Sequence, residues 1–543
     1  MPTSLDTGTL NFCWSQALIG GLVAAGVERA VISPGSRSTP LALAMLRQPG
    51  LDCEVIIDER SAAFFALGAA RASRRPVIVL ATSGTAVANW LPAVIEANLA
   101  GIPLILLSAD RPPELQGVGA NQTMAQPGLF GEQVRACHVM GTPEQGFDSK
   151  ALSALAARAV EQATWPHPGP VHINQPFREP LIPATATPPT PAATSIRTSR
   201  SCSQPDPAAI AELAQAMAGR PGLIVCGELP PEQGFAEAVA SLAEHLACPI
   251  LAEPLSNLRF GRHDRSHLIV HYNQWLSQQA AAVGKPAWIL RFGAFPVTRS
   301  LQGLLGEHSD VMALVDPWPR WSDPAHRLSH LLHASPLAVC QALLAAAPGA
   351  APSGWLASWL AADQGHEASQ SGAYARLIPH LMAALPAGCP VFVGNSLAIR
   401  MLDSHSGRSD KPLEFFANRG ASGIDGNISS ALGIAAERGR VVALLGDLTC
   451  QHDIGGLAAA RGRNAVILAV NNGGGGIFEM LPQAALPEFE RGWLTPQNID
   501  FHHAARAFGL SYAQSTVGPA LADLMQAAIA SGGPHLIEVT LEK

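Results

Sequence analysis

Short apolar runs alternate with helix-length segments in the first third and the last third of the sequence. The runs cover residues 30–32, 54–57, 77–80, 104–107, 391–393, 441–445, 465–470 and 535–539. An apolar run without polar alternation is typical of a strand that is buried on both faces of a sheet. Because such strands alternate with helical segments, the pattern predicts an α/β fold, with mostly parallel sheets and helices on both faces.

Two stretches interrupt this periodicity and divide the chain into three predicted domains. Residues 183–207 are rich in Pro, Ala, Thr and Ser, which is typical of an extended linker. Residues 351–372 form a weaker linker, because Trp355 and Trp359 within it could pack. The sequence therefore predicts an N-terminal, a central and a C-terminal domain, over residues 1–182, 208–350 and 373–543.

The central region has apolar runs of its own, at residues 223–225, 288–290 and 311–315. We therefore expect a third sheet there. Gly227 follows the first run, as it would in a nucleotide-binding turn. No Gly-x-Gly-x-x-Gly pattern accompanies it, so we interpret this glycine as structural.

Composition argues against several function classes. Of the 543 residues, 48% are hydrophobic and 14% are charged, which is typical of a well-buried globular enzyme. The net charge is −7 and no run of Lys or Arg stands out, so we expect no nucleic acid partner. No apolar stretch is long enough to span a bilayer, and the nine cysteines form no Cys-x-x-Cys pair. We expect a cytoplasmic protein with reduced thiols and no membrane partner.

Two polar motifs follow neighbouring apolar runs near the C-terminus. Gly446-Asp447 follows one run and Asn471-Asn472 follows the next, and residues 453–463 between them predict a crossover helix. Parallel neighbours end at the same edge of a sheet, so Asp447 and Asn472 should converge there. A carboxylate and an amide oxygen suit Mg²⁺ or Ca²⁺ that holds a diphosphate. The spacing is that of the thiamine-diphosphate motif, but an ordinary βαβ unit with an acidic turn also fits it.

Glu59 follows the run at residues 54–57 and is the candidate acid for such a cofactor. Thiamine catalysis needs a carboxyl group that hydrogen-bonds the aminopyrimidine and shares a proton near neutral pH. We therefore expect Glu59 to be buried and its pKa to be raised. The alternative is a surface triplet, Asp58-Glu59-Arg60, ahead of a helix that Ser61 caps.

Arginines recur at predicted strand ends in a sequence with few charges. Arg37 and Arg111 each follow an apolar run. Arg400 lies four residues after Ser396 in a predicted helix, so both should lie on one face. Singly, each arginine fits a solvated side chain. Together they indicate a polyanionic substrate, since Arg binds carboxylates in bidentate fashion.

Three segments are distinctive: Ser-Pro-Gly-Ser-Arg-Ser at 33–38, Thr-Ser-Gly-Thr-Ala-Val-Ala-Asn at 82–89 and Asn-Arg-Gly-Ala-Ser-Gly-Ile-Asp-Gly at 418–426. With the two C-terminal motifs, they closely resemble the thiamine-diphosphate-dependent 2-succinyl-5-enolpyruvyl-6-hydroxy-3-cyclohexene-1-carboxylate (SEPHCHC) synthases of menaquinone and phylloquinone biosynthesis. Similar segments run through both outer domains, whereas the central domain matches weakly. The resemblance implies a three-domain thiamine-diphosphate fold, in which the N-terminal domain binds the pyrimidine and the C-terminal domain binds the diphosphate.

The resemblance also implies roles for the matching residues. It makes Glu59 the catalytic residue, and it makes Asp447, Asn472 and the carbonyl of Gly474 the metal ligands. The residues implied to bind the cofactor are Glu59, Ser422, Gly423, Ile424, Gly446, Asp447, Leu448, Asn472, Gly474 and Ile477. The residues implied to bind substrate are Ser36, Arg37, Arg111, Asn121, Gln122, Arg299, Ser396, Arg400, Arg419 and Phe478.

Three apolar positions complete this set. By the same resemblance, Ile424 supports the bent form of the cofactor, and Ile477 and Phe478 form an apolar wall. Core packing at the start of a helix is the alternative for Ile477 and Phe478. Leu448 replaces the glycine at the third position of the usual Gly-Asp-Gly, which also resembles the synthases.

The resemblance implies a carboligase (transferase) that uses thiamine diphosphate with Mg²⁺ or Mn²⁺. It would decarboxylate 2-oxoglutarate and add the succinyl carbanion equivalent to isochorismate by 1,4-addition, with release of CO₂. A homodimer or homotetramer with sites at subunit interfaces is also implied. The alternatives are another thiamine-diphosphate 2-oxoacid decarboxylase or carboligase, or a binding protein with an inactive site. The presence of Glu59, Asp447 and Asn472 argues against an inactive site.

Overall fold

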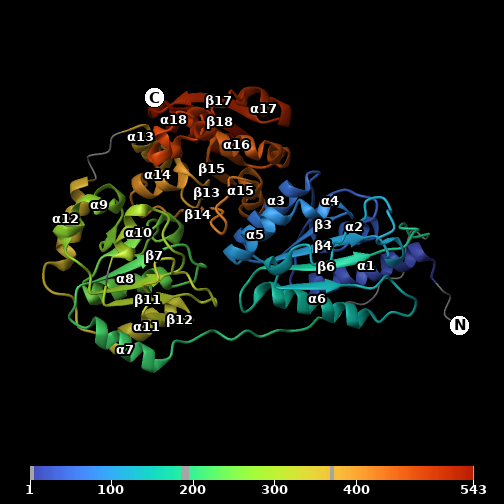
Figure 1. The fold of residues 1–543 in the computed structure, drawn as a ribbon, viewed down its shortest axis with the longest axis horizontal. Helices are drawn as coiled ribbons and strands as arrows, with labels where there is room; N and C mark the ends of the chain where they lie inside the picture. Colours follow the sequence, from blue (N-terminus) through green and yellow to red (C-terminus); the bar gives the residue numbers. More distant parts are fainter. Residues whose placement is uncertain (1–4, 185–194, 308, 367–371, 542–543) are drawn as a thin grey trace.

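The computed structural model describes residues 5–184, 195–307, 309–366 and 372–541. Its strands form three six-stranded sheets whose neighbouring strands run parallel. The sheets belong to three lobes that meet at the centre of the molecule (Figure 1). The predicted α/β fold with parallel sheets is therefore confirmed, while the exact domain boundaries stay a prediction.

The N-terminal sheet has the strand order β2-β1-β3-β4-β6-β5. Its strands are β1 (Arg29–Ile32), β2 (Asp52–Val55), β3 (Val77–Ala81), β4 (Leu104–Asp110), β5 (Ala136–Val139) and β6 (Pro170–Pro176). Its helices are α1 (Thr7–Ala24), α2 (Thr39–Leu46), α3 (Glu59–Ser73), α4 (Thr85–Ala88), α5 (Leu91–Ala100) and α6 (Ser149–Thr164). Alternate strand residues face opposite layers: Ile105 packs with α1, α2 and α6, whereas Leu106 packs with α3 and α5. Both faces are thus buried, as the unbroken apolar runs predict.

The central sheet has the order β12-β11-β10-β7-β8-β9, which is the order of a doubly wound nucleotide-binding sheet. Its strands are β7 (Gly222–Cys226), β8 (Ile250–Ala252), β9 (Leu268–Ile269), β10 (Trp288–Phe292), β11 (Val311–Val315) and β12 (His330–Leu332). Helices α7 (Pro207–Met217), α8 (Phe235–Leu246) and α11 (Pro336–Ala346) cover one face, and α9 (Tyr272–Val283), α10 (Arg299–Gly306) and α12 (Trp355–His366) cover the other.

Two features of the central domain bear on the predictions. A Cβ on Gly227 would lie 2.3 Å from the carbonyl oxygen of Ala294, which supports the structural interpretation of this glycine. Helix α12 lies within the stretch predicted as a weak second linker. Its Trp359 is fully buried and packs on Trp275, with 5.5 Å between ring centroids. Much of this stretch is therefore packed structure.

The C-terminal sheet repeats the strand order of the N-terminal one, as β14-β13-β15-β16-β18-β17. Its strands are β13 (Pro390–Val393), β14 (Glu414–Phe416), β15 (Val441–Gly446), β16 (Ala465–Asn471), β17 (Ser511–Thr516) and β18 (Pro534–Thr540). Its helices are α13 (Ala373–Ala384), α14 (Leu397–His405), α15 (Asn427–Arg438), α16 (Asp447–His452), α17 (Phe501–Phe508) and α18 (Pro519–Ser531). Short helical turns are η1 (Pro113–Leu115), η2 (Gly131–Gln133), η3 (Pro254–Ser256), η4 (Ile454–Ala460), η5 (Gly476–Met480), η6 (Pro482–Ala485) and η7 (Glu490–Leu494).

The prediction of one crossover helix over residues 453–463 was wrong. Helix α16 begins at Asp447 and ends at His452, and the 3₁₀ segment η4 follows it. Two glycines at the start of η4 disfavour an α-helix. The buried carboxylate of Asp453 also ties the chain to α15, because it accepts a hydrogen bond of 2.7 Å from the backbone N–H of Ser429.

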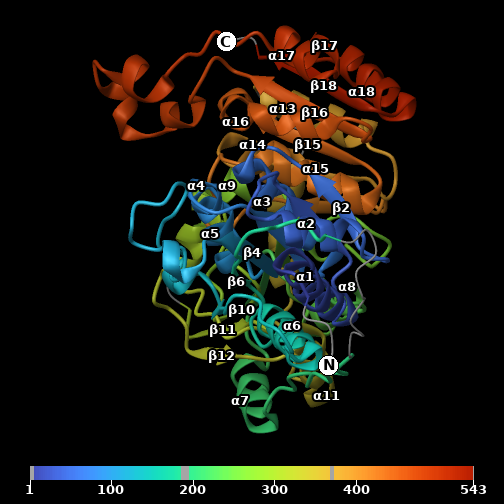
Figure 2. The same cartoon turned by 90° about the vertical axis from the view of Figure 1, so that its right-hand side faces the viewer.

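Helices α3 and α15 join the N-terminal and C-terminal domains, and they lie side by side in both views (Figures 1 and 2). A Cβ on Gly68 would lie 2.0 Å from the carbonyl oxygen of Ser430, and a Cβ on Gly433 would lie 2.0 Å from that of Phe65. The two glycines therefore allow the helix backbones to approach closely. One hydrophobic core runs from the N-terminal sheet through both helices into the C-terminal sheet.

None of the helices in the described part of the chain has the length and apolar character needed to cross a membrane.

Candidate active site

The two C-terminal motifs meet at one edge of the C-terminal sheet. Strands β15 and β16 pair in parallel, with Gly446 opposite Val470. Asp447 and Asn472 therefore follow adjacent strand ends, as predicted. The carboxylate of Asp447 is 4% exposed and accepts hydrogen bonds of 2.8 Å from the backbone N–H groups of Leu448 and Gly474. Burial raises the pKa of Asp447, and these backbone donors partly offset the rise.

Gly474 gives the backbone access to this carboxylate. Its φ is +126°, and a Cβ there would lie 2.1 Å from the carbonyl oxygen of Leu494. Only glycine fits both the conformation and the space. The turn after β16 therefore needs glycine at position 474, and the backbone N–H of Gly474 binds it to Asp447.

Asn472 supplies the observation that tests whether a cation fits here. Its Oδ1 is buried, and no donor in the described residues hydrogen-bonds to it. A buried amide oxygen without a donor is costly unless a ligand completes it. With the carboxylate of Asp447 and nearby carbonyl groups, it forms the hard oxygen set that Mg²⁺ binds together with phosphate oxygens. The residues present therefore fit a divalent cation and the diphosphate of the predicted cofactor.

The glycine-rich turn at residues 418–426 lies next to the start of α14. Asn395 donates hydrogen bonds of 2.8 Å to the carbonyl oxygen of Asn418 and 2.7 Å to that of Gly423. Ser422, in the predicted cofactor set, has φ +64°. Ile424 and Ile477 are half-buried, as are Leu448 and Phe478. Ile477 and Phe478 lie in η5, a position that fits both packing at the start of a helix and an apolar wall beside a cofactor.

Three arginines of the predicted substrate set lie close enough for their charges to interact. Burial lowers the pKa of Arg400, and the charges of Arg419 and Arg299 lower it further. Arg400 donates to the carbonyl oxygen of Ser396 at 2.8 Å, and Arg419 donates to Oδ1 of Asn395 at 2.7 Å. Within the described residues, none of the three arginines forms an ion pair. Arginines that lack a carboxylate partner are available to bind an anion.

Glu59 begins α3 in the N-terminal domain. Asp58, not Ser61, caps the helix and accepts hydrogen bonds from Arg60 N–H at 2.9 Å and Ser61 N–H at 3.1 Å. Glu59 is half-buried in the single chain rather than buried. Arg60 donates to the carbonyl oxygen of His452 at 3.0 Å, so the segment is anchored to the C-terminal domain. Glu59 is thereby left at the rim of its own domain.

The other N-terminal candidates lie at strand ends of the same sheet. Arg111 donates to the carbonyl oxygen of Asn121 at 3.1 Å, so these two candidates are together. Gln122 is exposed and has φ +53°. Arg37 is buried, binds the carbonyl oxygen of Phe177 at 2.9 Å and pairs with Glu179 at 2.7 Å. Its guanidinium is thus already occupied, while neighbouring Ser36 is exposed.

The predicted site residues therefore form two groups. The first contains Ser36, Arg37, Glu59, Arg111, Asn121 and Gln122, and the second contains Arg299, Ser396, Arg400, Arg419, Ser422, Gly423, Ile424, Gly446, Asp447, Leu448, Asn472, Gly474, Ile477 and Phe478. Across the described residues, no hydrogen bond or ion pair joins a side chain of the first group to the second.

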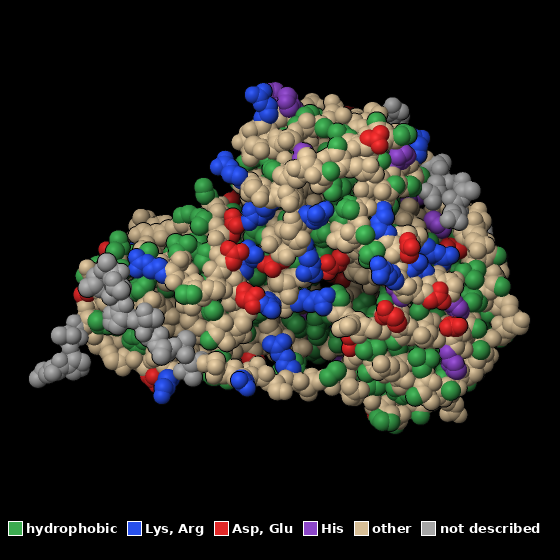
Figure 3. All heavy atoms as spheres, turned by 180° about the vertical axis from the view of Figure 1, so that it is seen from behind, with side chains coloured by type: hydrophobic (Ala, Val, Ile, Leu, Met, Phe, Trp, Pro, Cys, Tyr) green, Lys and Arg blue, Asp and Glu red, His purple; other side chains and the backbone are tan. Residues whose placement is uncertain are grey.

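A cavity of about 740 Å³ lies where the three domains meet. Its lining includes Arg71, Arg74, Arg320 and Arg419 but neither Asp447 nor Asn472. The face shown in Figure 3 has Lys and Arg side chains gathered around a hollow between the lobes. The cavity borders the arginine group but lies apart from the candidate cation site.

Comparisons with known proteins agree with this geometry. The N-terminal and C-terminal TPP-binding domains of thiamine pyrophosphate enzymes match residues 14–129 and 400–539. A 2-succinyl-5-enolpyruvyl-6-hydroxy-3-cyclohexene-1-carboxylate synthase from Dechloromonas aromatica (strain RCB) is 59% identical over 98% of this chain and 99% of its own length. The chain belongs to the SEPHCHC synthase family. A synthase of the same name from Geobacillus kaustophilus (strain HTA426) is 42% identical over 97% of the chain and 94% of its own length.

The fold of this family member also has a solved counterpart. A benzoylformate decarboxylase from Polynucleobacter necessarius superposes with a TM-score of 0.73 at 18% identity, and the match covers 97% of this chain and 98% of that one. At that identity the likeness shows the shared fold. The fold is thus the α/β fold of thiamine pyrophosphate enzymes, as the resemblance implies.

Glu96, which the sequence did not single out, contacts the glycine-rich turn of the candidate site. It lies in α5 and is 2% exposed. Its carboxylate accepts hydrogen bonds from the backbone N–H groups of Gly420 (2.8 Å), Ala421 (2.6 Å) and Ser422 (3.4 Å). It also pairs with Arg71 at 3.3 Å. The available signal was a single charged residue in a mostly apolar helix, where an unpaired charge would be costly.

Proposed function

We propose that this protein is a thiamine-diphosphate-dependent SEPHCHC synthase that decarboxylates 2-oxoglutarate, releases CO₂ and adds the remaining four-carbon unit to isochorismate by 1,4-addition. The observation that carries the proposal is the placement of Arg400 and Arg419, which bond to the adjacent residues Ser396 and Asn395, in the chain that also carries the cation-type oxygen set. Both substrates are dicarboxylates, and arginine recognises carboxylates by bidentate hydrogen bonds. Family membership at 59% identity supports the same reaction.

Asp447, Oδ1 of Asn472 and the carbonyl of Gly474 would hold Mg²⁺ or Mn²⁺, and through it the diphosphate. Ser422, Gly423, Gly446 and Leu448 would lie along the cofactor, with Ile424 supporting its bent form and Ile477 against it. When bound, thiamine diphosphate supplies an electron sink for the loss of CO₂ from a 2-oxo acid. The buried position of Asp447 suits this role, because a cation favours the carboxylate form that burial alone disfavours.

Glu59 would hold and share a proton at the pyrimidine ring nitrogen. Ser36, Arg37, Arg111, Asn121 and Gln122, together with Ser396, would bind substrate carboxylates and hydroxyls. Phe478 would exclude water from the reacting carbon, because protonation there would divert the reaction to simple decarboxylation. For Arg37, this role requires that the ion pair with exposed Glu179 open when substrate binds.

The separation of the two residue groups favours an oligomeric enzyme. Glu59 lies at the rim of its domain next to Ile57, whose side chain is 83% exposed, and Val55, which is 53% exposed. An exposed apolar strand end beside a catalytic residue is typical of a subunit interface. We infer that the N-terminal group of one subunit completes the C-terminal group of another, in a homodimer or homotetramer. A cytoplasmic location stays a prediction.

The test is to follow isochorismate consumption by purified protein with thiamine diphosphate, Mg²⁺ and 2-oxoglutarate, omitting each component in turn. Consumption that requires every component is the expected result. Release of CO₂ from 2-oxoglutarate without loss of isochorismate would refute the synthase and favour another thiamine-diphosphate decarboxylase or carboligase. No reaction at all would refute both and favour a binding protein.

A further inference from the structure

Arg299, Arg400 and Arg419 belong to three separate segments, so their relative positions depend on how these segments are joined. Arg299 begins α10 of the central domain, Arg400 lies in α14 of the C-terminal domain, and Arg419 lies in the glycine-rich turn. Like charges at close range repel, and each lowers the tendency of its neighbours to remain protonated. No described carboxylate forms an ion pair with any of them, so their relative positions depend on what fixes α10 and α14.

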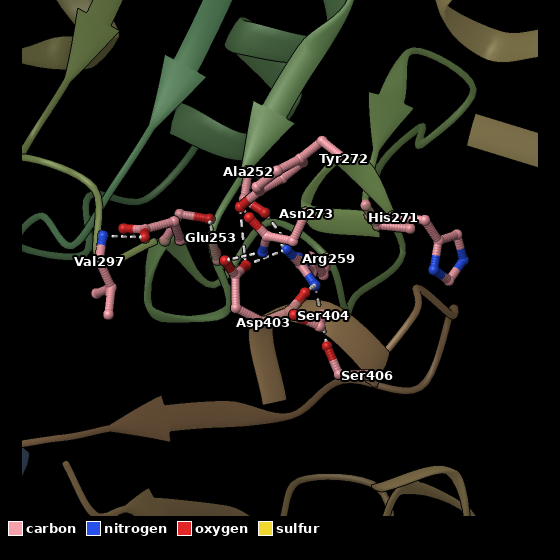
Figure 4. Close-up of polar contacts among 12 residues, drawn as sticks. Ala252, Glu253, Arg259, His271, Tyr272, Asn273, Val297, Asp403, Ser404 and Ser406 are labelled. Atoms are coloured by element: carbon pink, nitrogen blue, oxygen red, sulfur yellow. Dashed lines mark hydrogen bonds and ion pairs between the residues drawn. The ribbon is translucent and has the colours of Figure 1, made fainter. Parts of the chain in front are cut away.

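A buried polar network joins these two helices (Figure 4). Asp403, one turn after Arg400 in α14, is 1% exposed. Its carboxylate accepts hydrogen bonds from the hydroxyl of Tyr272 at 2.8 Å and from Nδ2 of Asn273 at 2.5 Å. Oδ1 of Asn273 accepts a hydrogen bond from the hydroxyl of Ser300, the residue after Arg299. One amide thus bridges the two arginine-bearing helices.

Arg259 ties the same network to the central sheet. It is fully buried and pairs with the carboxylate of Asp403. Its guanidinium also donates to the backbone carbonyl of Asp403 at 2.7 Å and to that of Ala252 at 2.6 Å. The first bond satisfies a carbonyl near the C-terminal end of α14, where a cation is favourable. The second fixes that helix end to the end of β8.

Glu253 follows Ala252 and holds the segment that leads into α10. Its carboxylate is 3% exposed and accepts a hydrogen bond of 2.6 Å from the backbone N–H of Val297, two residues before Arg299. Burial, and then the charge of Asp403, raise the pKa of Glu253, while the charge of Arg419 lowers it. Glu253 therefore lies close enough to Asp403 and to Arg419 for both charges to affect its pKa.

We propose that Glu253, Asn273 and Asp403 are positioning residues, which hold Arg299 and Arg400 opposite Arg419 so that they bind a substrate carboxylate. This inference rests on the proposed function, and it assigns a role to the central domain. The central sheet has the strand order of a nucleotide-binding domain. Glu253 follows its second strand, β8, and here this acidic residue anchors the segment that carries Arg299. Cofactor binding should not depend on the network, because none of the three touches the cation-type oxygen set.

The test compares Asn273→Ala with Gln274→Ala in the complete enzyme with thiamine diphosphate and Mg²⁺. Both residues are half-buried in α9, and Gln274 donates to the carbonyl oxygen of Ser404 at 3.0 Å without bridging to α10. We expect Asn273→Ala to raise KM for 2-oxoglutarate or isochorismate by at least about tenfold, since misplacement by about 1 Å can cost that much. We expect kcat and the Kd of thiamine diphosphate to change by less than about threefold, and Gln274→Ala to resemble the wild type.

Unchanged KM values for both substrates would overturn the positioning role. A parallel loss of thiamine diphosphate affinity would also overturn it, because it would indicate general damage to the fold. Glu253→Ala, which removes the acceptor for Val297 N–H, gives a second test if Asn273→Ala does not fold, and the same rise in KM is expected. Failure of the proposed function is distinguishable, since the wild type itself would then consume no isochorismate.

Discussion

Replacing Glu96 by Gln is expected to weaken thiamine diphosphate binding by roughly 10- to 100-fold, or about 1.4–2.8 kcal/mol. Glu96 does not need to touch the cofactor for this effect. It holds the turn that carries Ser422, Gly423 and Ile424, through three backbone N–H groups. The substitution keeps the shape of the side chain and removes its charge and one of its two acceptor oxygens.

The magnitude follows from the hydrogen bonds that are lost. Oε2 of Glu96 accepts from Ala421 N–H at 2.6 Å and Ser422 N–H at 3.4 Å, while Oε1 accepts from Gly420 N–H at 2.8 Å. A hydrogen bond to a charged group contributes about 1.5–3 kcal/mol. An amide nitrogen at either position would oppose a backbone donor with another donor. At least one strong bond is therefore lost, and cofactor binding must then reorder the turn at the expense of affinity.

Calorimetric titration of thiamine diphosphate in the presence of Mg²⁺ measures the effect directly. Glu228→Gln is the matched control: Glu228 pairs with Arg71, the same arginine that Glu96 binds, at 2.5 Å. It forms no described side-chain hydrogen bond with the turn. A Kd for Glu96→Gln within about twofold of the wild type would refute the reasoning. Equal weakening in Glu228→Gln would assign the effect to Arg71 instead of the turn.

Three further predictions concern single carboxylates. Glu59→Gln should leave the Kd of thiamine diphosphate within a few-fold and reduce kcat by about 100-fold or more, because an amide cannot share the required proton; near-normal turnover would contradict the assignment. Asp447→Ala should abolish the Mg²⁺ dependence of cofactor binding measured by titration, and unchanged affinity would exclude it as a ligand. Burial raises the pKa of Asp453 to about 6 from 3.8, so its contribution to stability is present below pH about 4 and is lost as pH rises through 6. Relative to Asp453→Asn, the wild type should therefore lose up to about 3 kcal/mol between pH 4 and pH 7; parallel thermal unfolding curves for the two proteins across this range would argue against it.

The sequence was sufficient for the fold and for the convergence of Asp447 and Asn472. Buried parallel strands have an unbroken apolar pattern, and the rule that parallel neighbours end at one edge brings their following residues together. The strand predicted at 54–57 is shifted to Asp52–Val55. Ile56 and Ile57 follow the strand and are not part of it. Ile56 packs in the core, whereas Ile57 is exposed at the rim.

The hydrogen bonds that position the candidate site could not be predicted, because they join residues far apart in the chain. Glu96 contacts backbone N–H groups more than 320 positions away, and backbone groups leave no signature in the sequence. The network around Asp403 joins α9, α10 and α14, and nothing in the sequence distinguishes Asn273 from the neighbouring polar residue Gln274. Glu59 is half-buried rather than buried, because the burial of a residue at the rim of its domain depends on what covers that rim.

The core that α3 and α15 share has a consequence for how the chain is made. About 350 residues separate the end of α3 from the start of α15. At common rates of translation, roughly 20 to 70 s pass between their synthesis. Throughout that interval α15 is absent, so the face of α3 that carries Gly68 is uncovered. The N-terminal domain therefore cannot reach its final stability. Folding of this domain should therefore finish after translation, and the nascent chain should bind chaperones that recognise exposed apolar helices.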